Sequence, residues 1–127
     1  MAYAYDDQNI FARILRGEIP CSKVHETAHS LAFHDINPQA PTHVLVVPKG
    51  PYVNFDHFAE AASEIEMADF VRAIGHVAAM TGHTEAAGGN GYRLLSNAGA
   101  DAHQEVAHLH VHVVGGKFLG RMLRVPD

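Results

Sequence analysis

Residues 107–114 read Ala-His-Leu-His-Val-His-Val-Val, and a pair of glycines follows at 115 and 116. Side chains alternate between the two faces of a β-strand, so this stretch predicts a strand with one polar and one apolar face. The apolar face, which we expect to pack on the core, consists of Leu109, Val111 and Val113. The polar face, which we expect to be open, consists of His108, His110 and His112.

The rest of the chain predicts short strands and a helical middle. Apolar spacing indicates a short helix over 9–16. A long helix should begin after Ser63, end at Gly82 and follow one or two helical turns that start at Asp56. The expected strands are 23–26, 30–34, 42–47, 92–96 and 107–114. Because strands and helices do not alternate strictly, we predict an α+β fold with a five-stranded, mostly antiparallel sheet, one long helix and one short helix.

Composition excludes several classes of protein. A length of 127 residues predicts one domain over 1–127, and a net charge of −5 provides no basic surface for long nucleic acid. No stretch approaches the roughly 20 apolar residues of a membrane helix. The single Cys21 excludes an intrachain disulfide and a cysteine-based zinc cluster. An acidic start without an apolar run predicts a cytoplasmic protein.

Three interpretations of the histidine strand remain open on these grounds. It could be the polar face of a sheet in a chain with 11 histidines. It could bind a metal ion, with His43 as a further ligand. However, the outer two histidines lie about 13 Å apart along a strand, and no carboxylate lies within the triplet. Finally, a neutral imidazole is a good nucleophile toward phosphorus, and a neighbouring histidine can supply a proton.

The sequence resembles the histidine triad (HIT) family, and within it the Hint-like branch of purine nucleoside phosphoramidases. The resemblance covers nearly the whole chain. It is carried by Asn9-Ile10-Phe11, Gly17-Glu18-Ile19-Pro20, the segment from Ala32 to His43, Val46-Val47-Pro48-Lys49, Gly91-Tyr92-Arg93, Asn97 and the segment from His108 to Gly116. The histidine triad in combination with the segment from Asp35 to His43 is highly specific for this family.

The resemblance implies a HIT-like fold, a homodimer and a catalytic cycle that needs no metal and no cofactor. His110 would be the nucleophile that takes a nucleoside monophosphate from nitrogen or from an acyl group. His112 would contact the phosphate and the leaving group, while His108 and His43 would orient the rings. The product would be a purine nucleotide such as AMP or GMP. The alternative function is a nucleotide-binding or partner-binding module without catalysis.

The resemblance also implies how the nucleotide is held. Asp35 would accept hydrogen bonds from the ribose hydroxyls, although an aspartate before Ile36-Asn37-Pro38 could equally cap a turn. Phosphate oxygens would be held by Asn97 and by the backbone N–H groups of Gln104, Glu105 and Val106. The base pocket would consist of Phe11, Ile14, Ile19, Phe33 and Ile36, with His34 at its edge. The histidines at 25, 29, 57, 76 and 83 match no functional position of the family, and we expect them to be solvated.

One departure from the family pattern concerns the residues before the triad. Many Hint enzymes have Gly-Gln-Ser there, and the serine helps to protonate the leaving nitrogen. This chain has His103-Gln104-Glu105. An ionised Glu105 directed into the site would repel a phosphate. Either Glu105 is protonated and acts as the acid, or it faces solvent and His112 protonates the leaving group.

Overall fold

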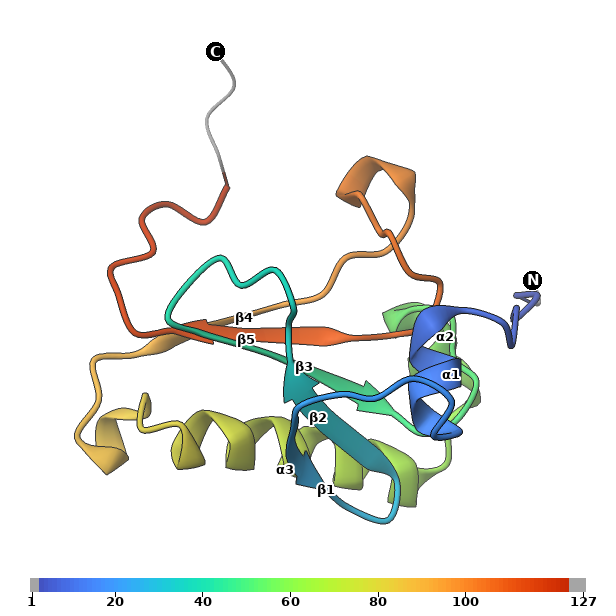
Figure 1. The fold of residues 1–127 in the computed structure, drawn as a ribbon, viewed down its shortest axis with the longest axis horizontal. Helices are drawn as coiled ribbons and strands as arrows, with labels where there is room; N and C mark the ends of the chain where they lie inside the picture. Colours follow the sequence, from blue (N-terminus) through green and yellow to red (C-terminus); the bar gives the residue numbers. More distant parts are fainter. Residues whose placement is uncertain (1–2, 124–127) are drawn as a thin grey trace.

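A five-stranded antiparallel sheet forms the centre of the molecule (Figure 1). The computed structural model describes residues 3–123. The strands are β1 Lys23–Glu26, β2 Ser30–His34, β3 Thr42–Pro48, β4 Tyr92–Leu95 and β5 Val111–Gly115. Their order across the sheet is β1-β2-β3-β5-β4, with every neighbouring pair antiparallel. The predicted α+β class and five-stranded sheet are confirmed.

The helices are α1 Ile10–Leu15, α2 Phe55–Ala61 and α3 Glu64–Met80. The turns expected from Asp56 form a separate seven-residue helix, α2, which Asn54 caps. The predicted start of the long helix is confirmed, because the Ser63 hydroxyl accepts from the Glu66 N–H while the Glu66 carboxylate accepts from the Ser63 N–H. Two 3₁₀ turns, η1 Glu85–Ala87 and η2 Ala100–Ala102, lie in the later loops. Within residues 3–123, no helix is long and apolar enough to span a membrane.

The two faces of the sheet pack against different helices. The apolar face of β5 packs under α3 with alternate residues of β3, as Figure 1 shows for the long helix below the sheet. On the other face, Phe11 of α1 packs on apolar residues of β2 and β3. The same face of the sheet carries His43 and His112, because Leu45 pairs with His112 and side chains two residues apart share a face. The short helix α1 therefore lies on the face that carries the histidines.

The strand predicted over 107–114 begins later than expected, at Val111. The ladder between β3 and β5 ends at Val46 and Val111, and beyond it β3 reaches Pro48, which has no N–H to donate. Other groups hold residues 109 and 110 instead. The Leu109 N–H donates to the Tyr52 carbonyl (2.8 Å), and the Ser96 hydroxyl donates to the His110 carbonyl (2.8 Å).

The expectation of solvated histidines outside the triad is wrong for four of the five. Only His76 is exposed, while the other four are half-buried. His83 contacts the Thr42 hydroxyl at 2.7 Å, and a side chain at Gly115 would collide with its ring. The His57 ring accepts a hydrogen bond from the Val53 N–H at 2.9 Å.

Candidate functional site

The His110 ring is held in one tautomer. Its Nδ1 lies 2.7 Å from the His108 carbonyl oxygen, which can only accept, so Nδ1 carries the proton. A neutral imidazole has one N–H, and Nε2 of His110 is therefore left with a free lone pair. Burial lowers the pKa of His110, so the ring stays neutral at neutral pH. The rings of Phe11 and His110 pack edge to face, with centroids 5.0 Å apart.

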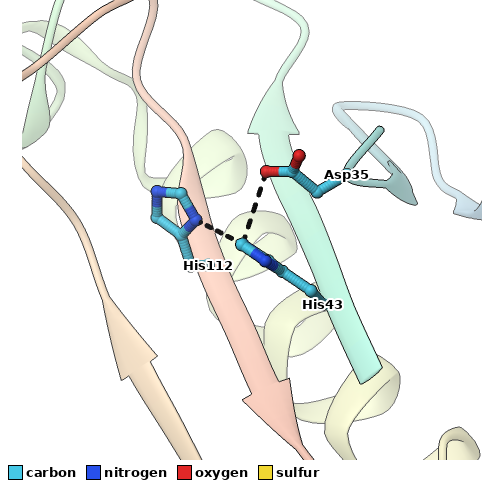
Figure 2. Close-up of side chains that lie close together, drawn as sticks. All are labelled: Asp35, His43 and His112. Atoms are coloured by element: carbon cyan, nitrogen blue, oxygen red, sulfur yellow. Dashed lines mark hydrogen bonds and ion pairs between the residues drawn. The ribbon is translucent and has the colours of Figure 1, made fainter. Parts of the chain in front are cut away.

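A second chain of hydrogen bonds fixes His112 (Figure 2). The Gln39 N–H donates to Nδ1 of His43 (3.0 Å), so the proton of the His43 ring is on Nε2. That Nε2 lies 2.8 Å from Nδ1 of His112 and donates to it. His112 consequently carries its own proton on Nε2, which is buried and has no hydrogen-bond partner within residues 3–123. Burial and the neighbouring His110 and His43 lower the pKa of His112 to about 4.

Asp35, directly after β2, contacts His43 near the start of β3. Its N–H donates to the His43 carbonyl (2.9 Å), and its Oδ1 accepts from the Asn37 N–H (2.8 Å). The turn-capping interpretation of Asp35 is thus correct for one carboxylate oxygen. The other oxygen, Oδ2, lies 3.4 Å from Nε2 of His43. Figure 2 shows this carboxylate beside the two histidines. One side chain therefore serves both the turn and the histidine pair.

Asp35, His43 and His112 have ligand atoms within 4.8 Å of one another, the spacing of a metal site. Their hydrogen bonds do not fit an ion. Nδ1 of His43 faces a backbone N–H, so binding an ion through Nε2 would require a ring with no proton at all. The 2.8 Å between His43 and His112 is also shorter than the roughly 3.3 Å between two nitrogens on a tetrahedral zinc. The geometry instead fits a hydrogen bond from Nε2 of His43 to Nδ1 of His112.

A cavity of about 340 Å³ opens beside His43 and His112. Among the side chains that line it are Asn97, Arg93 and Lys117. No aspartate or glutamate of the described chain lines it, so its charge suits an anion. Asn97 was expected at a phosphate. Arg93 and Lys117 were not assigned a role by the sequence, because nothing local shows that they lie across the sheet from His43.

The loop over 97–106 carries Glu105 on its exposed side. The Gln104 amide donates to the carbonyls of Val53 (2.7 Å) and Val106 (3.0 Å), and its oxygen accepts from the Gly99 N–H. Glu105 is exposed and lies 2.9 Å from Nε2 of His103. His103 itself has a φ of 57°, in the left-handed region that favours glycine. Of the two roles considered for Glu105, this geometry fits the solvent-facing one.

The expected base pocket is assembled only in part. Phe11 and Phe33 pack edge to face, with centroids 5.6 Å apart, and Ile14 packs on the same cluster. Ile14 and Ile19 also line a cavity of about 680 Å³. Ile36 and His34, by contrast, are exposed, and the Ile36 side chain is 87% accessible. The structure thus brings four of the six residues to one region and leaves the other two at the surface.

The histidine face is not open throughout, contrary to the expectation from the strand pattern. His108 is fully buried, with its Nε2 2.8 Å from the Pro48 carbonyl and its Nδ1 2.6 Å from the Tyr5 hydroxyl. Burial lowers the pKa of His108 to about 4. Sequence reasoning missed Tyr5, and no local pattern could reveal a contact across 103 residues.

Comparisons with known proteins agree on one family. The HIT domain family model matches residues 16–119. A 13.2 kDa HIT-like protein of Azospirillum brasilense is 61% identical over 97% of this chain and 98% of its own length. The purine nucleoside phosphoramidase of Escherichia coli K12 is 40% identical over 92% of this chain and 94% of its own. A HIT family hydrolase from Clostridium thermocellum superposes with a TM-score of 0.78, at 35% identity over 92% of this chain and 98% of that one.

Proposed function

Since the chain belongs to the HIT family, we propose that it is a metal-independent hydrolase of purine nucleoside 5′-phosphoramidates and acyl-nucleotides. Membership of the family and the named activity of the E. coli relative support a nucleotide hydrolase. The observation that carries the proposal is the tautomer of His110. A buried imidazole whose Nδ1–H is tied to a carbonyl presents the lone pair of Nε2, which is what an attack on phosphorus requires.

The reaction proceeds in two displacements at the α-phosphorus. In the first, the lone pair of His110 Nε2 forms a bond to phosphorus as the bond from phosphorus to the leaving nitrogen breaks. The electron pair of that bond departs with the nitrogen, which takes up one proton. In the second, a water oxygen attacks phosphorus, the electron pair of the P–N bond returns to His110, and the nucleoside monophosphate is released. An acyl-nucleotide releases a carboxylic acid in place of the amine.

His112 supplies the proton for the leaving group. Its buried Nε2–H has no partner within residues 3–123, and the His112 side chain lines the smaller cavity. The free protein holds His112 neutral, so the His43–His112 pair must gain a proton when the anionic substrate binds, and the negative phosphate favours that gain. The pair gives this proton to the leaving nitrogen and recovers one from the attacking water. Glu105, exposed and paired with His103, has no part in this transfer.

The nucleotide is held from two sides. Asn97 and the backbone N–H groups of Glu105 and Val106 bind the phosphate oxygens, where hydrogen-bond donors stabilise developing charge. The third expected donor, the Gln104 N–H, instead donates to the Gly99 carbonyl (3.1 Å). The purine lies against Ile14 and Ile19, which line the larger cavity, and the buried Phe11 and Phe33 support Ile14 from behind. Asp35 accepts from the ribose hydroxyls through Oδ2, the carboxylate oxygen that does not cap the turn. Ile36 and His34, both exposed, close over the base from the rim.

The chain acts as a single domain over 1–127 that pairs with a second copy in the cytoplasm. Strand β4 lies at the edge of the sheet and bonds to β5 on one side only. Tyr92, Leu94 and Leu95 on this strand are large apolar residues that remain exposed. An apolar edge strand with free backbone groups favours pairing with the same strand of a partner. The exposed, unpaired thiol of Cys21 suits a reducing compartment.

The test is incubation of the protein with adenosine 5′-phosphoramidate, with and without a chelator, and measurement of AMP. The parent should release AMP equally under both conditions. His110→Ala and His110→Gly should release none above background. His76→Ala is the matched control, because His76 is exposed on α3, and it should behave as the parent does. Binding without AMP release would instead indicate a nucleotide-binding module, and loss of activity on chelation would indicate a metal enzyme.

A further inference from the structure

The arm over residues 3–15 packs directly on the triad. The Tyr5 hydroxyl lies 2.6 Å from Nδ1 of His108, and the two rings meet edge to face with centroids 5.6 Å apart. Phe11 of the same arm contacts the rings of both His108 and His110. The family match begins at residue 16, so both aromatic residues lie outside it. The arm is nonetheless part of the environment of the nucleophile.

The direction of the hydrogen bond between Tyr5 and His108 follows from its neighbour. The Pro48 carbonyl can only accept, so Nε2 of His108 carries the ring proton. The neutral ring has no second proton, and Nδ1 must therefore accept from the Tyr5 hydroxyl. Burial raises the pKa of Tyr5, so the phenol keeps its proton at neutral pH. Each nitrogen of this fully buried ring thus has one partner of the right kind.

The backbone of His108 connects its ring to the nucleophile, His110. Its carbonyl oxygen is the acceptor for Nδ1–H of His110, at 2.7 Å. Without the phenol, a buried acceptor would have no donor, so the ring would have to turn or draw in water. A turn of the ring would break its bond to Pro48 and disturb the peptide unit that holds His110.

We propose that Tyr5 is a positioning residue, whose hydroxyl satisfies Nδ1 of His108, holds that ring in its orientation and thereby holds His110 with Nε2 free. The tautomer of His108 depends only on the described contacts. The effect on turnover rests on the proposed function. The Tyr5 ring lines the larger cavity together with Ile14 and Ile19. Removal of the hydroxyl alone keeps this ring, so it should lower kcat and leave KM unchanged.

The first test is spectroscopic. Tyr5→Phe keeps the ring and removes the hydroxyl, and Tyr3→Phe is the matched control because its hydroxyl bonds to Asp56 and not to the triad. The ¹⁵N signals of the His108 ring should report a protonated Nε2 and an unprotonated Nδ1 in the parent and in Tyr3→Phe. In Tyr5→Phe these signals should shift. Unchanged signals in Tyr5→Phe would overturn the proposal, whatever the rate does.

The second test is kinetic. Loss of one buried hydrogen bond should lower kcat with adenosine 5′-phosphoramidate by about tenfold in Tyr5→Phe, with KM within about twofold. Tyr3→Phe should match the parent. Parent-like kcat alongside shifted His108 signals would also overturn the positioning role. If the parent itself releases no AMP, the proposed function fails, and the ¹⁵N signals still decide whether the Tyr5 hydroxyl holds the His108 ring.

Discussion

Nε2 of His43 donates a hydrogen bond to Nδ1 of His112 across 2.8 Å, from one strand of the sheet to its neighbour. The direction of this bond is fixed, because the other nitrogen of His43, Nδ1, accepts from the Gln39 N–H and so cannot carry the ring proton. The Gln39 N–H therefore determines, through His43, that Nε2 of His112 carries an N–H and not a lone pair.

His43→Phe tests this constraint, because it removes the donor and retains a ring. His112 would then lose its partner and populate both tautomers, so kcat with adenosine 5′-phosphoramidate should fall by roughly 10- to 100-fold. The comparison is His25→Phe, a half-buried histidine that stacks on His76 away from the triad, and it should retain parent kcat. Full activity of His43→Phe would show that the pair has no catalytic role.

Glu105→Gln should leave activity within about threefold of the parent, because the carboxylate is exposed and paired with His103. The measurement is kcat/KM with adenosine 5′-phosphoramidate at pH 7. A loss of 30-fold or more would assign Glu105 the role of the acid and remove that role from His112. Glu60→Gln, on the exposed surface of α2, controls for the loss of one negative charge.

The pH dependence of turnover should reflect a nucleophile that resists protonation. Burial lowers the pKa of His110 below its usual 6.5, so the ring remains neutral when an exposed histidine would already be charged. The acidic limb of kcat/KM should therefore have its midpoint below pH 6.5. A midpoint at or above pH 6.5 in the parent would contradict the burial of a neutral His110.

Stability should fall in mild acid because His108 is buried in its neutral form. Its folded pKa is about 4, whereas the unfolded chain takes up this proton near pH 6.5. The stabilisation is complete above pH 6.5 and is lost as the pH falls toward 4, since the unfolded state binds the proton first. Urea unfolding at pH 7 and pH 5 should show a decrease of about 2 kcal/mol from this ring alone. Equal free energies of unfolding at the two pH values would contradict the burial of neutral His108.

Leu94→Lys should convert the protein to monomers if β4 is the dimer interface. A lysine at an edge strand adds a charge that opposes pairing with a second copy. Sedimentation of the parent should give the mass of two chains, and that of Leu94→Lys the mass of one. Ile65→Lys, at an exposed apolar position on α3, should sediment as the parent does. A monomeric parent would contradict the proposed dimer.

Local patterns were sufficient to predict most elements of this fold. A Val- and Leu-rich run that ends at Pro48 located β3, and the Ser63 capping signature located the start of α3. The start of β5 at Val111, four residues later than expected, was not predicted, because it depends on where the neighbouring strand β3 reaches Pro48. Pairing across the sheet is a long-range property, and the alternating pattern of a single strand does not report where its partner ends.

The candidate site was predicted unevenly for the same reason. The alternation of histidines correctly separated the triad from the apolar side chains under α3. It could not indicate that His108 would be covered, because the covering Tyr5 is 103 residues away. Arg93 and Lys117 were likewise missed, since only the fold brings them to the cavity beside His112. The tautomer of each ring depends on which backbone carbonyl or N–H group lies beside it, and every residue type except proline carries the same two groups. The sequence alone therefore does not predict the tautomers.

The contact between Tyr5 and His108 also bears on how relatives of this chain are compared. A chain shortened to residues 16–119 would still contain the complete histidine triad and would match the same family model. It would nevertheless leave Nδ1 of His108 without its donor and remove the Phe11 ring that packs beside His110. Two homologues with identical triads can thus differ in the groups that support them. Activity comparisons within the family therefore need full-length chains, and alignments should extend to the residues that precede the shared domain.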